Sequence, residues 1–257
     1  MKILTVVSEH RFLFEELVKR DFKDKYKRTV LGMVWSILLP LFTLLIMKIV
    51  FSNFFGRSIE HFTIYLFCGN LLFAYFREST HVWMSALLGN ASIFTKINIP
   101  KYLFLLSRNV SSLINFGINL CVFFVFCMID KIDFSWNFFT LLYPVICLLI
   151  FNLGVGFILS ALYIFFRDIQ YLYDVFTMLL MYMSAIFYSV KSFPEEYQKF
   201  FLCNPVYVYI SYFREVVLDG NIPGLMLHLL AAGYALGALL IGAWFYKKFN
   251  KKFLYYV

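Results

Sequence analysis

The sequence predicts an all-α membrane protein with six transmembrane helices, an N-terminal amphipathic interface helix, and re-entrant helices between the fifth and sixth spans. Composition is the first observation behind this prediction, since 62% of the 257 residues are hydrophobic and only 15% are charged. A soluble domain is closer to half apolar and a quarter charged, so lipid is the expected solvent for one domain that covers residues 1–257. The second observation is that the apolar residues form long runs without the alternation of a barrel, which leaves helices to satisfy the backbone inside lipid.

Residues 1–30 are expected to form the interface helix. Phe12, Leu13, Leu17 and Val18 recur at helical spacing, and charged residues occupy many of the other positions. A basic helix with one apolar face usually lies along the membrane surface, and docking on protein is the alternative. No cleavable signal is expected in this long charged segment. Its C-terminal half carries the basic residues Lys19, Arg20, Lys23, Lys25, Lys27 and Arg28.

The six-helix membrane domain is expected over residues 31–246. Each apolar run supplies the roughly 20 residues that the hydrocarbon core of a bilayer requires. The predicted spans are 31–55, 62–88, 104–129, 138–165, 171–190 and 225–246. Residues 247–257 are expected to form a basic tail.

Lys and Arg are distributed unevenly between the two sides of this arrangement. Most of them lie in residues 1–30, in the loop after the second span and in the tail, whereas the segments on the other side carry few. Cytoplasmic segments are enriched in Lys and Arg, so both termini are expected in the cytoplasm. The same placement beside apolar spans accounts for the net charge of +8 without a nucleic-acid partner.

The longest connection, residues 191–224, falls on the outer side and is rich in aromatic residues. Pro194 and Pro205 divide it into two helix-sized pieces. Short apolar pieces suit re-entrant or interfacial helices, which are tolerated at membrane depth only where protein or a wet cavity surrounds them. A structured outer mouth is therefore expected here.

Motifs for catalysis or metal binding are missing from the sequence. It contains no GxxxxGK[ST] phosphate-binding loop, no HExxH and no GxSxG, and its four histidines are scattered. The five cysteines include no CxxC pair and are interpreted as small core residues. The chain is therefore not expected to be an enzyme or to hold a metal or cofactor. A membrane-embedded transferase is the alternative, although no acid, base or metal-binding pair supports it.

Polar and aromatic residues inside the predicted spans are the candidates for a transport pathway. Arg77 and Glu78 lie within the second span, where ionisable residues either face a water-filled path or pair with another helix, and both interpretations stay open. Tyrosine combines an apolar face with a polar group, which suits the C–H faces and hydroxyl edges of a sugar. Lipid-facing bulk is the alternative for these rings. The aromatic candidates are Tyr65, Tyr75, Tyr182, Phe187 and Tyr188.

Several segments, in order along the chain, resemble those of one family. They are RDFKDKYKRTVLGMVWS at 20–36, NASIFTKINIPK at 90–101, FRDI at 166–169 and SAIFY at 184–188, followed by Pro194–Glu195, Asn204–Pro205 and Arg214. Their order and spacing are similar to those of ABC-2 type permeases that export polysaccharides, such as O-antigen, capsule and teichoic acid exporters. One departure is Ala185, where that family commonly has Pro, and a less kinked helix is expected there.

The resemblance implies the permease subunit of an exporter that moves a lipid-linked polysaccharide across a bacterial cytoplasmic membrane. It implies a homodimer with two copies of a separate nucleotide-binding subunit, and that subunit would hold ATP and Mg²⁺. The implied substrate is a glycan on an undecaprenyl-diphosphate carrier. An ABC-2 exporter of a lipid or a drug is the nearest alternative.

The resemblance also implies roles for particular residues. The loop at 89–103 would dock in the nucleotide-binding subunit through Phe94, Lys96, Ile97, Pro100 and Lys101. The channel would be lined by Tyr65, Tyr75, Arg77, Glu78, Tyr182, Phe187 and Tyr188. The outer segment would form two gate helices marked by Pro194, Glu195, Asn204, Pro205 and Arg214. The basic residues of the interface helix would attract the lipid diphosphate, with ordinary membrane anchoring as the alternative.

Overall fold

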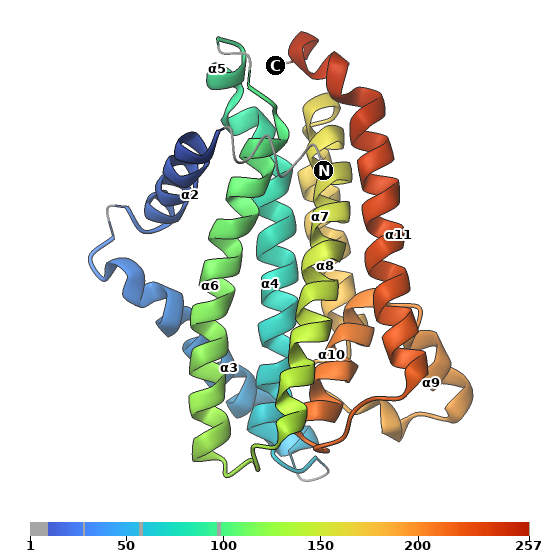
Figure 1. Ribbon diagram of the computed structural model, residues 1–257. Coiled ribbons are helices and arrows are strands. Elements are labelled where there is room, and N and C mark those ends of the chain that lie inside the picture. The colour runs from blue at the N-terminus through green and yellow to red at the C-terminus, as the bar shows by residue number, and fades with distance from the viewer. Residues whose placement is uncertain (1–9, 28, 57–58, 97–98, 257) are drawn as a thin grey trace.

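Helices form all the regular secondary structure in residues 10–27, 29–56, 59–96 and 99–256, the part of the chain that this computed structural model describes. The long helices run side by side, and short ones lie at the two ends of the molecule (Figure 1). In chain order the elements are α2 (Arg11–Tyr26), η1 (Gly32–Val34), α3 (Trp35–Phe55), α4 (Phe62–Gly89), α5 (Ala91–Phe94), α6 (Tyr102–Ile129), η2 (Trp136–Leu141), α7 (Leu142–Phe165), α8 (Ile169–Met183), η3 (Val190–Ser192), α9 (Glu195–Phe201), α10 (Pro205–Val217), α11 (Leu225–Phe249) and η4 (Asn250–Tyr255).

The long helices α3, α4, α6, α7, α8 and α11 occupy the residue ranges that the sequence predicts for the spans. By length and composition, four helical segments of the described chain are able to cross a membrane: Gly32–Phe55, Tyr102–Ile129, Trp136–Phe165 and Leu225–Phe249. Helices α4 and α8 are outside this set. Helix α8 has only 15 residues, and α4 carries Arg77 and Glu78 near its middle.

Helix α8 is shorter than the sequence predicts. A span over 171–190 is expected, but α8 ends at Met183, so that prediction is wrong in its last turns. The reason is a turn in which Ala185 adopts φ +50°, a left-handed conformation that its β-carbon disfavours. The Ser184 hydroxyl donates a hydrogen bond to the Leu180 carbonyl at 2.7 Å, so it satisfies one of the last carbonyls of the helix. The expectation of a less kinked helix at Ala185 is also wrong, because the helix stops there.

Helix α4 is the centre of the bundle. It packs between α6 and α7, and α3 and α10 contact it as well (Figure 1). Phe67 and Trp83 on α4 are fully buried. Helix α11 packs closely on α7, where a β-carbon added to Gly154 would lie 2.2 Å from the backbone of Ala238. These contacts fix α4, α6, α7 and α11 as one packed unit.

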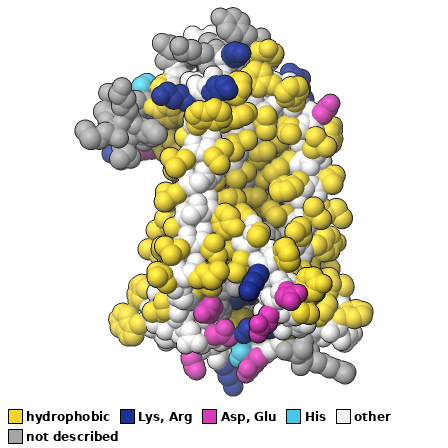
Figure 2. Space-filling model, turned by 90° about the vertical axis from the view of Figure 1, so that its right-hand side faces the viewer, with side chains coloured by type: hydrophobic (Ala, Val, Ile, Leu, Met, Phe, Trp, Pro, Cys, Tyr) yellow, Lys and Arg dark blue, Asp and Glu magenta, His cyan; other side chains and the backbone are white. Residues whose placement is uncertain are grey.

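One face of the bundle is apolar at mid-height and charged towards its ends (Figure 2). Figure 2 shows hydrophobic side chains over the middle of one face, with Lys and Arg near the upper end and a mixed group of acidic and basic side chains near the lower end. Helices α3 and α8 expose large apolar residues such as Phe42, Ile49 and Val175. Helix α5 and the C-terminal end of the chain lie at one end of the bundle, and α9 lies at the opposite end (Figure 1).

Candidate functional site

The first candidate region is the end of the bundle that holds α5, η4 and the start of α2, which we call the coupling end. Phe94 on α5 is buried and packs with Leu17 of α2 and Phe104 of α6. Lys96, two residues after α5, is exposed, and Pro100 is half-buried. Ile97 lies outside the described residues. Of the predicted docking residues, Lys96 therefore faces outward, whereas Phe94 holds the loop onto the helices below it.

Lys101 joins the loop to the C-terminal tail. Its Nζ donates to the Asn250 carbonyl at 3.1 Å and lies 5.7 Å from the ring centres of both Phe94 and Phe253. Partial burial lowers the pKa of Lys101. Phe253 itself is fully buried in a cluster with Trp83 of α4. This anchor was not predicted, and its only signal in the sequence is an aromatic residue within the basic tail.

The interface helix α2 docks on protein as well as presenting basic residues outward. Asp21 is almost fully buried, and it accepts hydrogen bonds from Arg20 at 2.8 Å and from the Ser107 hydroxyl of α6 at 3.0 Å. Arg108 Nε lies 3.4 Å from the same carboxylate. These contacts with α6 support the alternative that α2 docks on protein. Asp21 was not predicted as a contact residue, because it stands in a segment of mixed acidic and basic residues and nothing in the sequence distinguishes it from them.

The basic residues of α2 divide into two groups. Arg20 donates to Asn90 Oδ1, just before α5, at 2.7 Å, and Lys25 donates to Glu78 on α4 at 2.7 Å. Lys19 pairs with Glu16 at 2.8 Å, and Lys27 lies 3.9 Å from Asp24, both on the exposed side. Lys23 is exposed, and Arg28 lies outside the described residues. Arg20 and Lys25 thus bind within the chain, whereas Lys19, Lys23 and Lys27 face outward.

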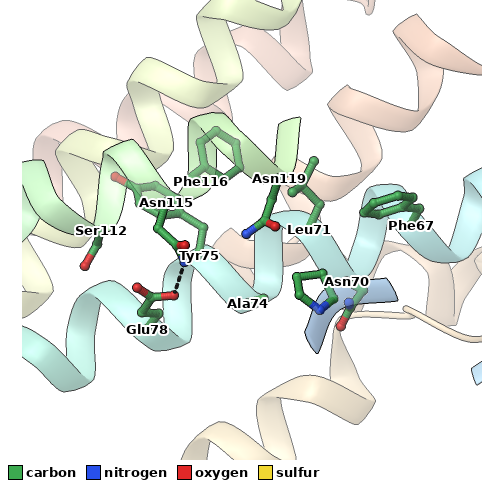
Figure 3. Close-up of a pocket in the computed structure, with 11 residues that line it drawn as sticks. Phe67, Asn70, Leu71, Ala74, Tyr75, Glu78, Ser112, Asn115, Phe116 and Asn119 are labelled. Carbon is green, nitrogen blue, oxygen red and sulfur yellow. Dashed lines mark hydrogen bonds between the residues drawn. The ribbon is translucent and has the colours of Figure 1, made fainter. Parts of the chain in front are cut away.

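The second candidate region is the middle of α4. Arg77 and Glu78 are neighbours and so point about 100° apart on the helix. Glu78 accepts a hydrogen bond from Lys25 at 2.7 Å and one from the Asn115 amide of α6 at 2.9 Å. Figure 3 shows the bond between Asn115 and Glu78 as a dashed line. Arg77 is exposed on a different side of that turn. Glu78 therefore makes helix-to-helix contacts, and Arg77 is the residue that points out of the bundle.

About one turn from Arg77 towards the C-terminal end of α4, this helix is joined to α8. His81 Nε2 lies 3.1 Å from Asp174, and the Tyr173 hydroxyl donates to Thr80 Oγ1 at 2.6 Å. Arg77, His81 and Asp174 consequently form a polar strip between two otherwise apolar helix surfaces. Asp174 was not among the predicted residues, although it lies in the same predicted span as Tyr182.

A small pocket opens between α3, α4 and α6 beside Glu78 (Figure 3). Its volume of about 30 Å³ is enough for one or two water molecules. The polar residues that line it are Asn70, Tyr75, Glu78, Ser112, Asn115 and Asn119. A sugar ring does not fit in this space, so a pathway for a glycan is not formed by this pocket.

The predicted aromatic residues are placed differently from one another. Tyr65, Tyr75 and Phe187 are buried inside the single chain, and Phe187 stacks on Phe51 of α3 with ring centres 4.4 Å apart. Tyr182 is half-exposed on α8, and Tyr188 is partly exposed. Of these five predicted aromatic residues, only Tyr182 and Tyr188 therefore present area at the surface of the chain.

The third candidate region is the outer segment. Pro194 and Glu195 are exposed at the start of α9. Asn204 caps α10, with Oδ1 accepting from the Val206 N–H at 3.0 Å, and Pro205 takes the first helical position. Arg214 is buried on α10 and donates to backbone carbonyls of α4 and of the turn after α8. Two short helices thus form where two were expected.

The chain is similar to known proteins over most of its length. Residues 13–218 match the family model described as ABC-2 type transporter. The chain is similar to an O-antigen export system permease protein, RfbA, of Klebsiella pneumoniae, at 27% identity over 82% of this chain and 83% of that protein. The O-antigen export system permease protein RfbA of Myxococcus xanthus is 24% identical over 87% of this chain and 86% of that protein. The polysialic acid transport protein KpsM of Escherichia coli is 25% identical over 91% of this chain and 92% of that protein.

Proposed function

The chain belongs to the ABC-2 type transporter family, and we propose that it is the permease subunit of an ABC exporter that moves a lipid-linked polysaccharide across a bacterial cytoplasmic membrane. The observation that carries this proposal is similarity over more than four-fifths of the chain to O-antigen and polysialic acid export proteins. The energy would come from ATP hydrolysis in a separate nucleotide-binding subunit that holds ATP and Mg²⁺.

In this proposal α3, α4, α6, α7, α8 and α11 are six membrane spans, with both termini in the cytoplasm. Lys96 beside α5 and Lys101 beside η4 lie at the coupling end, as expected for the cytoplasmic side. The 28 residues of α4 give a length of about 42 Å, which is sufficient to cross the bilayer. Helices α9 and α10 would then lie at the outer face.

The exposure of Arg77 supports a pathway between two copies of the chain. Arg77 lies close to the middle of α4, next to Glu78, which pairs with Lys25 of α2. An arginine exposed to lipid at the bilayer centre costs about 2.5–3.5 kcal/mol on insertion scales. In a homodimer whose protomers face each other through α3, α4 and α8, Arg77 and Tyr182 would instead line a wet channel.

The coupling end suits contact with the nucleotide-binding subunit. Lys96 is exposed beside α5, and α5 is tied through Phe94 to α2 and α6. ATP-driven closure of the two partner subunits would push α5 and tilt the protomers between two states. Exposed Lys23 would face the diphosphate of an undecaprenyl-linked glycan on the inner side.

The test is reconstitution with the partner ATPase. We expect a 2:2 complex by mass measurement, and ATP-dependent movement of a fluorescent undecaprenyl-diphosphate glycan across proteoliposomes. A fully active complex with one copy of the chain would refute the dimer. Transport of a lipid or drug, without transport of the glycan, would instead favour the other class of ABC-2 exporter.

A further inference from the structure

Arg214 lies buried on α10, and its hydrogen bonds in the described chain all go to backbone carbonyls. Nε and Nη2 donate to the Tyr65 carbonyl at 3.3 and 3.1 Å, Nη1 donates to Ala185 at 2.9 Å, and Nη2 donates to Ile186 at 3.0 Å. The guanidinium carbon also lies 3.4 Å from the ring centre of Tyr65. A buried cation is stable only with such complete pairing, so Arg214 is held in one place.

The carbonyls that Arg214 binds belong to a helix end. After α8 stops at Met183, the last carbonyls of the helix and those of residues 184–188, the outer turn, have no partners within the helix. Arg214 satisfies Ala185 and Ile186, while the Tyr65 hydroxyl donates to the Tyr188 carbonyl at 2.6 Å. Side chains of α4 and α10 thereby fix the outer turn, including Ala185 at φ +50°.

The N-terminal end of α10 adds a second attachment to the same turn. Asn204 Nδ2 donates to the Met183 carbonyl at 3.2 Å and to Ser184 Oγ at 3.0 Å, while its Oδ1 caps α10. Helix α10 is therefore bound to the turn near both of its ends.

The backbone of α4 comes close to this attachment at Gly69. A β-carbon there would lie 2.7 Å from Arg214 Nη2 and 3.2 Å from Ile186 Cγ2. Any side chain at position 69 would therefore push the guanidinium away from its carbonyls. Helix α9 is different, since Glu195, Tyr197 and Phe200 are exposed.

We propose that Arg214 is a positioning residue that fastens α10 and the outer turn to the outer half of α4, so that the outer mouth opens by movement of α9 while α10 stays attached. This role rests on the proposed export function, in which α9 and α10 lie at the outer face. Detaching α10 would leave a buried cation and three carbonyls without partners, whereas α9 can move without such a loss.

Two native cysteines report on this arrangement. Cys68 is fully buried next to Gly69, and Cys203 is exposed between α9 and α10. The full complex with its ATPase is reconstituted with its outer face accessible and is treated with a membrane-impermeant maleimide, and labelling of each cysteine is measured by mass spectrometry. We expect Cys203 to be labelled and Cys68 to stay protected, both at rest and during ATP turnover.

Variants test the part that Arg214 plays. In Arg214→Met and in Gly69→Ala we expect the labelling rate of Cys68 to rise about tenfold. The reason is that the loss of one hydrogen bond lowers the free energy of local opening. Gly117→Ala on α6 is the matched control, because a β-carbon there meets nothing within 4 Å. Gly69→Ala keeps the test valid if Arg214→Met does not assemble.

Two outcomes would overturn the proposal. One is labelling of Cys68 during turnover in the unmodified complex at a rate similar to that of Cys203, which would mean that α10 detaches in each cycle. The other is unchanged protection of Cys68 in Gly69→Ala and in any assembled Arg214→Met. Labelling requires no glycan, so a failure of the export assay leaves this result readable by itself.

Discussion

Asp21 shows how one buried side chain connects separate elements. Its carboxylate accepts from Arg20 of its own helix and from Ser107 of α6, and Arg20 also reaches Asn90, the residue before α5. A push on α5 would thus be passed through Arg20 and Asp21 to α2 and α6. Because the side chain is fully buried, removal of its charge leaves Arg20 and Arg108 without a counter-charge.

Replacement of Asp21 tests this connection. We expect Asp21→Asn to destabilise the complex by about 3 kcal/mol, since one partner of a buried ion pair is lost, and to raise the ATP hydrolysed per glycan moved. Thermal unfolding and the ratio of ATPase to export rates measure the two effects. Asp24→Asn, on the exposed side of the same helix, is the control. Equal behaviour of the two variants would contradict the assignment.

The pair of Lys25 and Glu78 is suited to a double-mutant cycle. The two side chains are 2.7 Å apart and only partly exposed, so their interaction is stronger than that of a surface pair. For Lys25→Met and Glu78→Gln we expect a coupling energy of about 1 kcal/mol in the free energy of unfolding. The exposed Lys23→Met, combined with Glu78→Gln, should be additive. Additivity in both cycles would show that α2 is not fastened to α4 through this pair.

At the scale of elements, the apolar runs predict the long helices well, because span length and burial are local properties of the sequence. The end of α8 was not predictable in this way. Residues 184–190 continue an apolar pattern, but Asn204 and Arg214, far along the chain, bind the carbonyls that a longer helix would have used. The docking of α2 was likewise hidden, since Ser107 and Arg108 lie more than eighty residues from Asp21.

The turn after α8 makes a prediction about Ala185. At φ +50° a glycine avoids the β-carbon penalty, so Ala185→Gly should raise the stability of the complex by about 1 kcal/mol. Proline fixes φ near −65° and cannot adopt this turn, so Ala185→Pro should lower stability by about 3 kcal/mol or more. Thermal unfolding of the purified complex measures both changes. Ala74→Gly, in the middle of α4, should instead lower stability by up to about 1 kcal/mol. A stabilising proline would mean that the turn has another conformation.

At the scale of the whole molecule, two surface features require different surroundings. The exposed apolar residues of α3 and α8, such as Leu45 and Leu179, are suited to lipid or to a second protomer. Arg77 of α4 is also exposed, near His81 and Asp174, which pair with each other at 3.1 Å, and it needs water or a polar partner. A single chain surrounded by lipid satisfies the first requirement and violates the second. In the proposed homodimer, two copies facing each other across a wet path would satisfy both.

Arg77→Met distinguishes these surroundings. If Arg77 lines the path of an anionic lipid-linked substrate, we expect export by the reconstituted complex to fall at least about tenfold, which is a loss of about 1.4 kcal/mol, with 2:2 assembly and basal ATPase retained. If Arg77 faced lipid, the same change would leave export intact and would raise stability by about 2.5 kcal/mol, because a charge leaves the hydrocarbon. Lys48→Met is the control, since Lys48 is exposed on α3 nearer the outer end, where its side chain reaches the interface. Export and thermal unfolding are measured on the same preparations. A residue that lines the path predicts a loss of export, whereas a residue that faces lipid predicts unchanged export and higher stability.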